Sequence, residues 1–234
     1  MRIEPEISGV NVVLLGDFNP AILTPAWFAL HGLLPQHVAE SAELRVANQQ
    51  VTEFAAEWMR LQVAAGHFFV ETLQAPHIRL CDFVARTFKE YLHHTPVRAF
   101  GINRDVHFRV KSLAERDRIG RTLAPVEPWG AWGQDLGLDG KQGGMTSLTM
   151  TRLNPEGRPS GGQINVTVEP SHRIGEGRIG VYVRVNDHYT IDNAELETAE
   201  RLIELFEDNF ESSLKRSDGI IDHVMSLAKK TKEA

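Results

Sequence analysis

The segment VRAFGINRDVHFRV, residues 97–110, decides the fold class of this chain of 234 residues. Its side chains alternate between apolar and polar, which is the pattern of a β-strand with one buried face and one face exposed to water. One face carries Phe100, Ile102, Val106, Phe108 and Val110, and the other carries Ala99, Asn103, Asp105, His107 and Arg109. Arg104 falls in the apolar series, so we expect a β-bulge or bend between Gly101 and Asp105.

Three further strands are predicted downstream, at residues 145–153, 163–169 and 178–186. The last two alternate as residues 97–110 do, with inward apolar side chains at Ile164, Val166, Val168, Ile179, Val181, Val183 and Val185. The connections between these strands are rich in glycine and proline, which are typical turn residues. This arrangement predicts an antiparallel sheet with one buried face and one wet face.

The N-terminal part predicts a similar mixture of strands and helices. Strands are expected at residues 10–15, 54–63 and 67–73, the last two joined by a turn at residues 64–66. Thr24 is a good N-cap, and Pro25 after it suits the first position of a helix. A helix should therefore begin there and run to about Leu34. A second helix should follow Pro76, because apolar residues recur there at three- and four-residue spacing.

The C-terminal part predicts two helices. Asp192 followed by Glu195 resembles a capping box, and the helix after it should run to about Leu214. A final amphipathic helix is expected at residues 219–230, and a short polar helix at residues 112–121. Residues 125–144 hold two prolines, six glycines and two tryptophans, so no regular element is predicted there.

These elements define the fold class as α+β, a largely antiparallel β-sheet with amphipathic helices packed on one face. We expect one domain over residues 1–234, with a Gly/Trp-rich loop at 124–144. Sub-halves at 1–95 and 96–234 share a coarse β-α-β-β-α order, although residue identity between them is negligible. An internal duplication is therefore left open.

Composition excludes several classes of function. The formal charge of −6 and the pI near 5.9 argue against nucleic-acid binding, which needs a surplus of Lys and Arg on one face. The single cysteine excludes an intramolecular disulfide and suits a reducing compartment. The sequence shows neither the pattern of a signal peptide nor an apolar run long enough to span a membrane, so we expect a cytoplasmic protein without membrane association.

The sequence LLGDFNP, residues 14–20, is the only segment that suggests an enzyme. An apolar strand there leads to Asp17 and Asn19, a position from which such side chains hold a water and a phosphate oxygen in metal-dependent phosphodiesterases. The GDFN segment, which begins at Gly16, is similar to a motif of the endonuclease/exonuclease/phosphatase family. The resemblance implies hydrolysis of phosphodiesters with a divalent metal, with Asp17 and Asn19 positioning the attacking water and the scissile phosphate.

The resemblance covers about six residues of 234. The family's motif follows strands that supply a metal-binding Glu, whereas thirteen residues precede Leu14 here. The family also closes with Ser-Asp-His, where this chain has Ser217-Asp218 followed by Gly219. In the other interpretation, Asp17 and Asn19 end a strand and shape an Asx-type turn into Pro20.

Other patterns of catalytic or metal-binding residues are missing from the sequence. It contains no HExxH, no paired CxxC, no nucleophile elbow and no nucleotide fingerprint, so no cofactor and no metal are predicted. Asn103, Asp105 and His107 share a strand face and have the chemistry of metal ligands, but the same face also suits the wet side of a sheet. Cys81 lies on an apolar helix stripe, so we expect a core thiol.

The candidate binding residues therefore lie on surfaces. The polar strand face contributes Asn103, His107, Arg109, Tyr182 and Arg184. Trp129 and Trp132 are either exposed anchors for a partner or buried indoles that pin the loop to its own domain. The leading prediction is a non-enzymatic binding or assembly protein acting through a protein partner or self-association. The alternative is the phosphodiesterase, and a third hypothesis is a small-molecule cavity between the sheet and the long helix.

Overall fold

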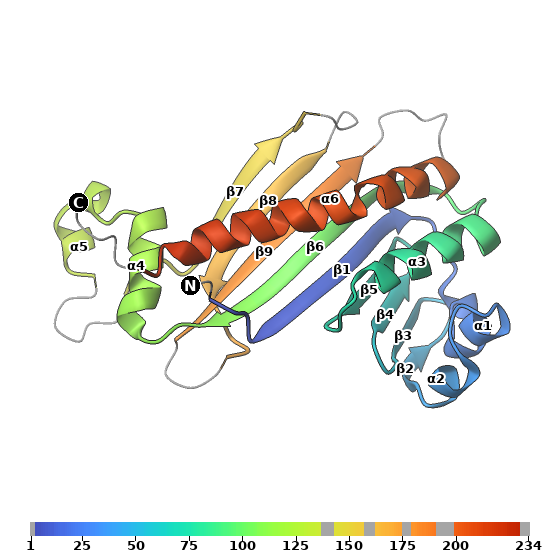
Figure 1. The fold of residues 1–234 in the computed structure, drawn as a ribbon. Helices are drawn as coiled ribbons and strands as arrows, with labels where there is room; N and C mark the ends of the chain where they lie inside the picture. The colour runs from blue at the N-terminus through green and yellow to red at the C-terminus, as the bar shows by residue number, and fades with distance from the viewer. Residues whose placement is uncertain (1–2, 137–142, 157–161, 175–178, 191–198, 230–234) are drawn as a thin grey trace.

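The structure is a computed structural model that describes residues 3–136, 143–156, 162–174, 179–190 and 199–229. Within these residues, nine strands form one antiparallel sheet in the order β2-β3-β4-β5-β1-β6-β9-β8-β7, and helices pack on one face of it (Figure 1). The predicted α+β class is thus confirmed. The strands are β1 (Ile7–Gly16), β2 (Glu43–Ala47), β3 (Val51–Ala55), β4 (Arg60–Ala64), β5 (His67–Thr72), β6 (Val97–Arg109), β7 (Leu148–Leu153), β8 (Gln163–Pro170) and β9 (Gly180–Thr190). The helices are α1 (Pro25–Leu30), α2 (Gln36–Glu40), α3 (Ile78–Arg86), α4 (Leu113–Leu123), α5 (Gly130–Gln134) and α6 (Ala199–Ser226).

The central strand β6 is continuous, and the predicted bulge near its middle is wrong. Its pairing with β9 keeps one register from Ala99 to Arg109. Arg104 stays on the helix-covered face, where it donates to the carboxylate of Asp218, the carbonyl of Gly9 and the hydroxyl of Ser8, each at 2.9 Å. A buried arginine with three acceptors needs no bulge to turn it outward, because its polar atoms are satisfied where they are.

Helix α6 is one element of 28 residues, although the sequence predicted two helices with a break between them. Polar residues near the predicted break bond to a polar partner on the sheet. Asp187 of β9 is 1% exposed and accepts hydrogen bonds from Ser213 and Arg216, each at 2.7 Å. The predicted start of this helix at Asp192 lies outside the described residues.

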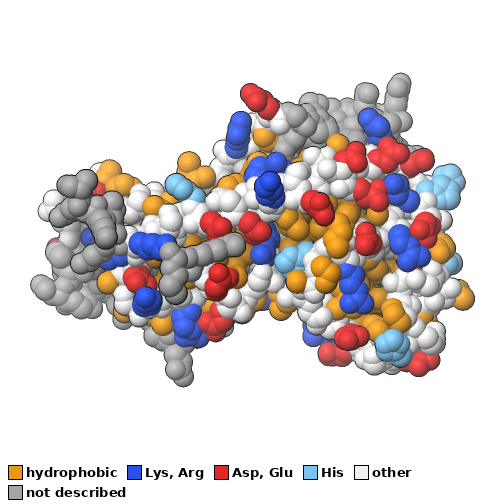
Figure 2. Space-filling model, in the orientation of Figure 1, with side chains coloured by type: hydrophobic (Ala, Val, Ile, Leu, Met, Phe, Trp, Pro, Cys, Tyr) orange, Lys and Arg blue, Asp and Glu red, His pale blue; other side chains and the backbone are white. Residues whose placement is uncertain are grey.

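The apolar core lies between the helices and the inner face of the sheet. Its larger cluster contains the fully buried rings of Phe68, Phe100 and Phe206. A second cluster, which includes Val183 and Ile221, lies under the C-terminal part of α6, so this helix spans both. Figure 2 shows the helix-covered face, where acidic and basic side chains are interspersed, so this face carries no large field of one sign.

The two halves of the chain share an element order around the central pair β1 and β6. Each of these strands is followed by two short helices, by a meander whose last strand returns to pair with it, and by a further helix, α3 or α6. The strand order is symmetric about the β1–β6 pair except for the extra edge strand β2. Each half therefore has the predicted order with additional strands.

Several boundaries in the first half differ from the sequence prediction. Residues 54–63 form parts of two strands, joined by a tight turn in which the amide of Ala56 donates to the carbonyl of Met59 at 2.8 Å. Helix α1 begins at its predicted Thr24 cap but ends four residues early, because Gly32 adopts a φ of 64°. Strand β2 and helix α2 were not predicted.

Candidate functional site

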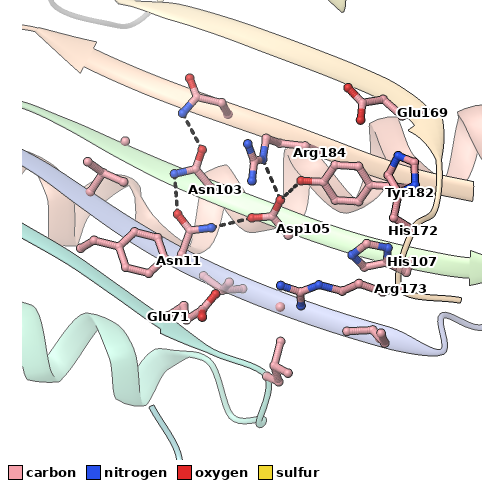
Figure 3. Close-up of a pocket in the computed structure, with 18 of the residues that line it drawn as sticks. Asn11, Glu71, Asn103, Asp105, His107, Glu169, His172, Arg173, Tyr182 and Arg184 are labelled. Atoms are coloured by element: carbon pink, nitrogen blue, oxygen red, sulfur yellow. Dashed lines mark hydrogen bonds and ion pairs between the residues drawn. The ribbon is translucent and has the colours of Figure 1, made fainter. Parts of the chain in front are cut away.

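The face of the sheet opposite the helices holds a cavity of about 550 Å³ (Figure 3). Outward side chains of β1, β5, β6 and β9 line it, together with residues at the end of β8 and in the connection to β9. Ile7 and Leu15 both belong to the lining. They lie eight residues apart on β1, so the cavity is a trough about 26 Å long at a rise of about 3.3 Å per residue.

A row of asparagines crosses the floor of the trough because the strand register brings them together. Asn11 lies opposite Asn103, Asn103 opposite Asn186, and Asn186 opposite Asn165. Side chains directly opposite one another in antiparallel strands are close enough to hydrogen-bond. We call Asn165, Asn186, Asn103 and Asn11 the asparagine row.

Every amide of the row donates in the same direction. Thr151 donates to Asn165, and each asparagine then donates its Nδ2 to the Oδ1 of the next, ending at Asn11. Asn11 in turn donates to the carboxylate of Asp105. A chain of hydrogen bonds that ends on a charge is polarised along its length, and each bond strengthens the next.

Asp105 accepts from two further donors in addition to Asn11. The Nε of Arg184 donates to its Oδ1 at 2.7 Å, and the hydroxyl of Tyr182 donates to the same oxygen. The Asp105 side chain is only 18% exposed. With three donors, one of them a guanidinium, the carboxylate of Asp105 is held in place as a fixed acceptor in the trough.

His107 and Tyr182 form a stacked pair at one end of the trough. Their ring centroids are 4.6 Å apart, and the Nδ1 of His107 is hydrogen-bonded to the hydroxyl of Ser171 at 2.8 Å. Burial, followed by the nearby charge of Arg173, lowers the pKa of His107. Burial and the charge of Asp105 raise the pKa of Tyr182. Both rings are therefore neutral at pH near 7.

Glycines and apolar side chains form the rest of the trough. Gly9 and Gly101 stand on the open face of β1 and β6, where a glycine leaves the strand backbone uncovered and lets a ligand approach closely. A Cβ added at Gly101 would lie 3.2 Å from the Nδ2 of Asn186. The apolar side chains in the lining include Val13, Phe69 and Leu73. The trough thus combines a polar network that is paired internally with open apolar surface.

The structure brings together most of the strand residues singled out in the sequence. Asn103, His107, Tyr182 and Arg184 line the trough. Arg109 follows His107 along β6 but is not among the lining residues, and it forms an ion pair with Glu6 at 2.8 Å. Sequence reasoning missed Asn11, Asn186, Glu71 and Arg173 as members of one site. The repeated asparagines at strand positions were the available signal, but pairing them requires the register.

The predicted loop residues lie away from the trough. Trp129 ends a short 3-10 turn and Trp132 lies in α5, so the prediction of no regular element at residues 125–144 is wrong in this part. The two side chains are 63% and 62% exposed, which contradicts the interpretation as buried indoles. Figure 1 places α5 beside α4, at the end of the molecule where α6 finishes.

Asp17 and Asn19 are engaged in local interactions at the end of β1. Asp17 forms an ion pair with Arg98 at 2.9 Å, and the hydrogen bond from Arg98 lowers the pKa of Asp17. Asn19 accepts from the amide of Ala21 at 3.2 Å, as expected for a residue that caps a turn. Asp105 lies opposite Gly9, which is about 26 Å along β1 from Asp17 at the usual strand rise.

Among the described residues, no group of three or more His, Cys, Asp and Glu side chains is placed to hold a metal ion. Asn103, Asp105 and His107 instead bond to other protein groups. Cys81 is buried as predicted, and burial raises its pKa to about 12, so the thiol is a poor nucleophile. No helix in the described part of the chain has an apolar stretch long enough to cross a bilayer.

Compared with known proteins, the chain matches no family model and no curated sequence.

Proposed function

We propose that this protein is a non-enzymatic binding protein that holds a small organic molecule in the trough on the open face of the sheet. The observation that carries the proposal is a cavity of about 550 Å³ whose polar groups bond to one another while its apolar wall and glycine floor stay open. This volume lies within the range of about 300–1,000 Å³ typical of small-molecule sites.

The pairing of the polar groups supports binding over catalysis. Asp105 accepts from three donors, and His107 is hydrogen-bonded to Ser171 and stacked on Tyr182. A general base needs an acceptor free to reach the substrate, and a nucleophile must itself be open to the substrate. Ser171, the hydroxyl beside His107, is buried and already accepts from the amides of Arg173 and Ile174. The same groups suit recognition, because a rigid hydrogen-bonded floor costs little entropy to present to a ligand.

The test uses a neutral fluorescent probe, the methyl ester of dansylaminoundecanoate, whose emission rises in an apolar site. Gly101→Leu fills the floor of the trough without changing any charge, and we expect it to weaken probe binding by at least about tenfold, since a leucine occupies the volume that the ligand needs. Thr149→Leu, on the open face of β7 and outside the lining, is the matched control. Equal binding to both variants, with circular dichroism showing both folded, would refute the proposal.

The exposed tryptophans support a second candidate, a protein partner or self-association through α5. Trp129 and Trp132 lie with ring centroids 5.7 Å apart and form a single apolar surface. Tryptophan is enriched at the energetic centres of interfaces. Sedimentation analysis of the wild-type protein and of the double variant Trp129→Ala, Trp132→Ala tests self-association. If both proteins have the mass of a monomer, self-association through α5 is ruled out. Capture of a protein partner by the wild type and not by the double variant supports the partner form of this candidate.

The phosphodiesterase alternative rests on the GDFN segment alone. The ion pair of Asp17 with Arg98 adds no support for it. Incubation with Mg²⁺ or Mn²⁺ and a chromogenic phosphodiester tests it directly. Turnover that is lost in Asp17→Ala would support it, and the absence of turnover would remove it.

A further inference from the structure

We propose that the ligand of the trough is an elongated amphipathic carboxylate, with its anionic end against Arg173 and its apolar body along the glycine floor. This inference rests on the proposed function and names the chemical class that the site takes. It follows from the distribution of charge along the trough, from the way Arg173 is held, and from the shape of the apolar part.

Most charges in the trough are already neutralised by neighbours. Asp105 is paired with Arg184 at 2.7 Å, and Glu71 is paired with Arg60 at 3.5 Å. Arg173 differs, because within the described residues its guanidinium has neither a hydrogen bond nor an ion pair. Figure 3 shows it directed into the trough beside His107. An unpaired guanidinium facing a partly enclosed site is a receptor for a carboxylate, which it can bind with two parallel hydrogen bonds.

Glu169 is the other carboxylate near this end, and it lies across the stacked rings from Arg173. The register places Glu169 opposite Tyr182, and Tyr182 opposite His107, so Glu169 stands two strands away from His107, about 10 Å at the usual strand spacing. Glu169 itself lines the trough, and its carboxylate accepts at 3.1 Å from the hydroxyl of Ser147, which is outside the lining. It therefore leaves the charge of Arg173 available to a ligand.

The backbone around Arg173 is fixed by its neighbours. The hydroxyl of Ser171 accepts from the amides of Arg173 and Ile174, at 3.2 and 3.1 Å, and bonds to His107. Ile174 is 1% exposed, and the amide of Ser171 donates to the carbonyl of Gly180 at 2.9 Å. Arg173 thus extends from an anchored turn, which reduces the ordering cost when it binds a ligand.

The charge and shape of the site narrow the class of anion. One unpaired guanidinium beside a neutral histidine balances a single negative charge, so a carboxylate fits better than a phosphate dianion. From the His107 end, the floor continues along β1 past Gly9 and across the asparagine row at Asn11 toward Val13. Leu73 lies over Gly9, with its Cδ2 2.9 Å from where a Cβ would stand. A ligand that uses this length is extended and largely apolar.

Dansylaminoundecanoate and its methyl ester test the proposal, because they differ only in the charge at one end. Titration of the full-length protein followed by fluorescence should show the acid binding about tenfold more tightly than the ester, the value of one charge-assisted bidentate contact of roughly 1.4 kcal/mol. In Arg173→Met the affinity for the acid should fall to that for the ester, whose own affinity should stay unchanged. Arg98→Met, which removes an exposed arginine of the same strand as His107 but outside the lining, is the matched control and should preserve the tenfold difference.

Two outcomes separate the two proposals. If the ester binds and the acid binds no more tightly, or if the preference for the acid survives in Arg173→Met, the assignment of a carboxylate is wrong and the binding function stands. If neither probe binds, or if both bind Gly101→Leu as they bind the wild type, the trough is not the binding site and both proposals fail.

Discussion

Replacement of Arg216 by methionine should remove about 3 kcal/mol from the free energy of unfolding. The Nη2 of Arg216 donates to Asp187 at 2.7 Å, and the Asp187 side chain is 1% exposed. Methionine keeps the apolar stem and removes the charge, so the buried carboxylate of Asp187 loses the positive charge that Arg216 supplies. Breaking a buried pair costs about 3–5 kcal/mol. We take the lower end, because the Arg216 side chain is 37% exposed and water screens the pair.

The matched control lies on the same helix. Arg201→Met makes the same chemical change at a pair with Glu204, whose two side chains are 67% and 47% exposed, so its cost should stay below about 0.5 kcal/mol. Urea denaturation measures both variants. With an m-value of about 3 kcal/mol/M, Arg216→Met should lower the midpoint by about 1 M and leave m unchanged.

A triple variant separates loss of a counter-ion from loss of packing. Asp187→Val, Ser213→Ala and Arg216→Met together remove the carboxylate with both of these partners, so most of the lost stability should return. The reasoning is refuted if Arg216→Met costs no more than Arg201→Met, or if the triple variant is less stable than Arg216→Met alone.

Four other variants and one change of pH give further expected outcomes, all measurable by urea denaturation. Gly219→Ala should stabilise the protein by about 0.5–1 kcal/mol, because Gly219 is inside α6 with no atom within 4 Å of an added Cβ; a loss would show that the helix is not formed there. Gly16→Ala should destabilise it by at least about 2 kcal/mol, because the added Cβ would lie 2.1 Å from the carbonyl oxygen of Pro96; a neutral effect would contradict this close approach. Burial lowers the pKa values of His77, His107 and His188, so the unfolded chain binds protons more readily than the folded chain. The stability that follows is present above their unfolded pKa of about 6.5 and is lost as the pH falls through their lower folded pKa values, and His107→Gln should reduce this loss below about pH 6.5. The double variant Trp129→Ala, Trp132→Ala should lose less than about 1 kcal/mol, because both rings are mostly exposed; a loss near 3 kcal/mol would mean that they anchor the segment.

The sequence identified the strands that alternate cleanly and missed those that do not. The strands β6, β8 and β9 follow the predicted pattern because each has one face under the helices. Strand β2 was missed because it is an edge strand with hardly any buried side chain, so no hydrophobic period marks it. The break predicted in α6 was wrong because Ser213 and Arg216 bond to Asp187 of β9 and Asp218 bonds to Arg104 of β6, a match that no single-segment pattern can reveal.

The site was only partly predictable from the sequence, because part of it depends on how the strands pair with one another. Alternation placed Asn103, His107 and Tyr182 on one face, as the structure has them. Asn11 stands inside the apolar run of the strand predicted at residues 10–15, and nothing in that run marks it as a site residue. Its meeting with Asn103 depends on the pairing of β1 with β6, which are joined by about eighty residues, and such a register cannot be derived from either strand alone.

All hydrogen bonds of the asparagine row run in one direction and end at Asp105. Asp105 therefore sets the direction in which every amide of the row donates. An amide can turn over and exchange its oxygen and nitrogen, and four amides turned together would bond to one another equally well. Only the carboxylate distinguishes the two arrangements, because it accepts a hydrogen bond and donates none. A change of charge at Asp105 would therefore free the orientation of every amide as far as Thr151 on β7, four strands and about 19 Å from Asn11. The amide dipoles of the row therefore all point the same way across the open face, in a direction that Asp105 sets.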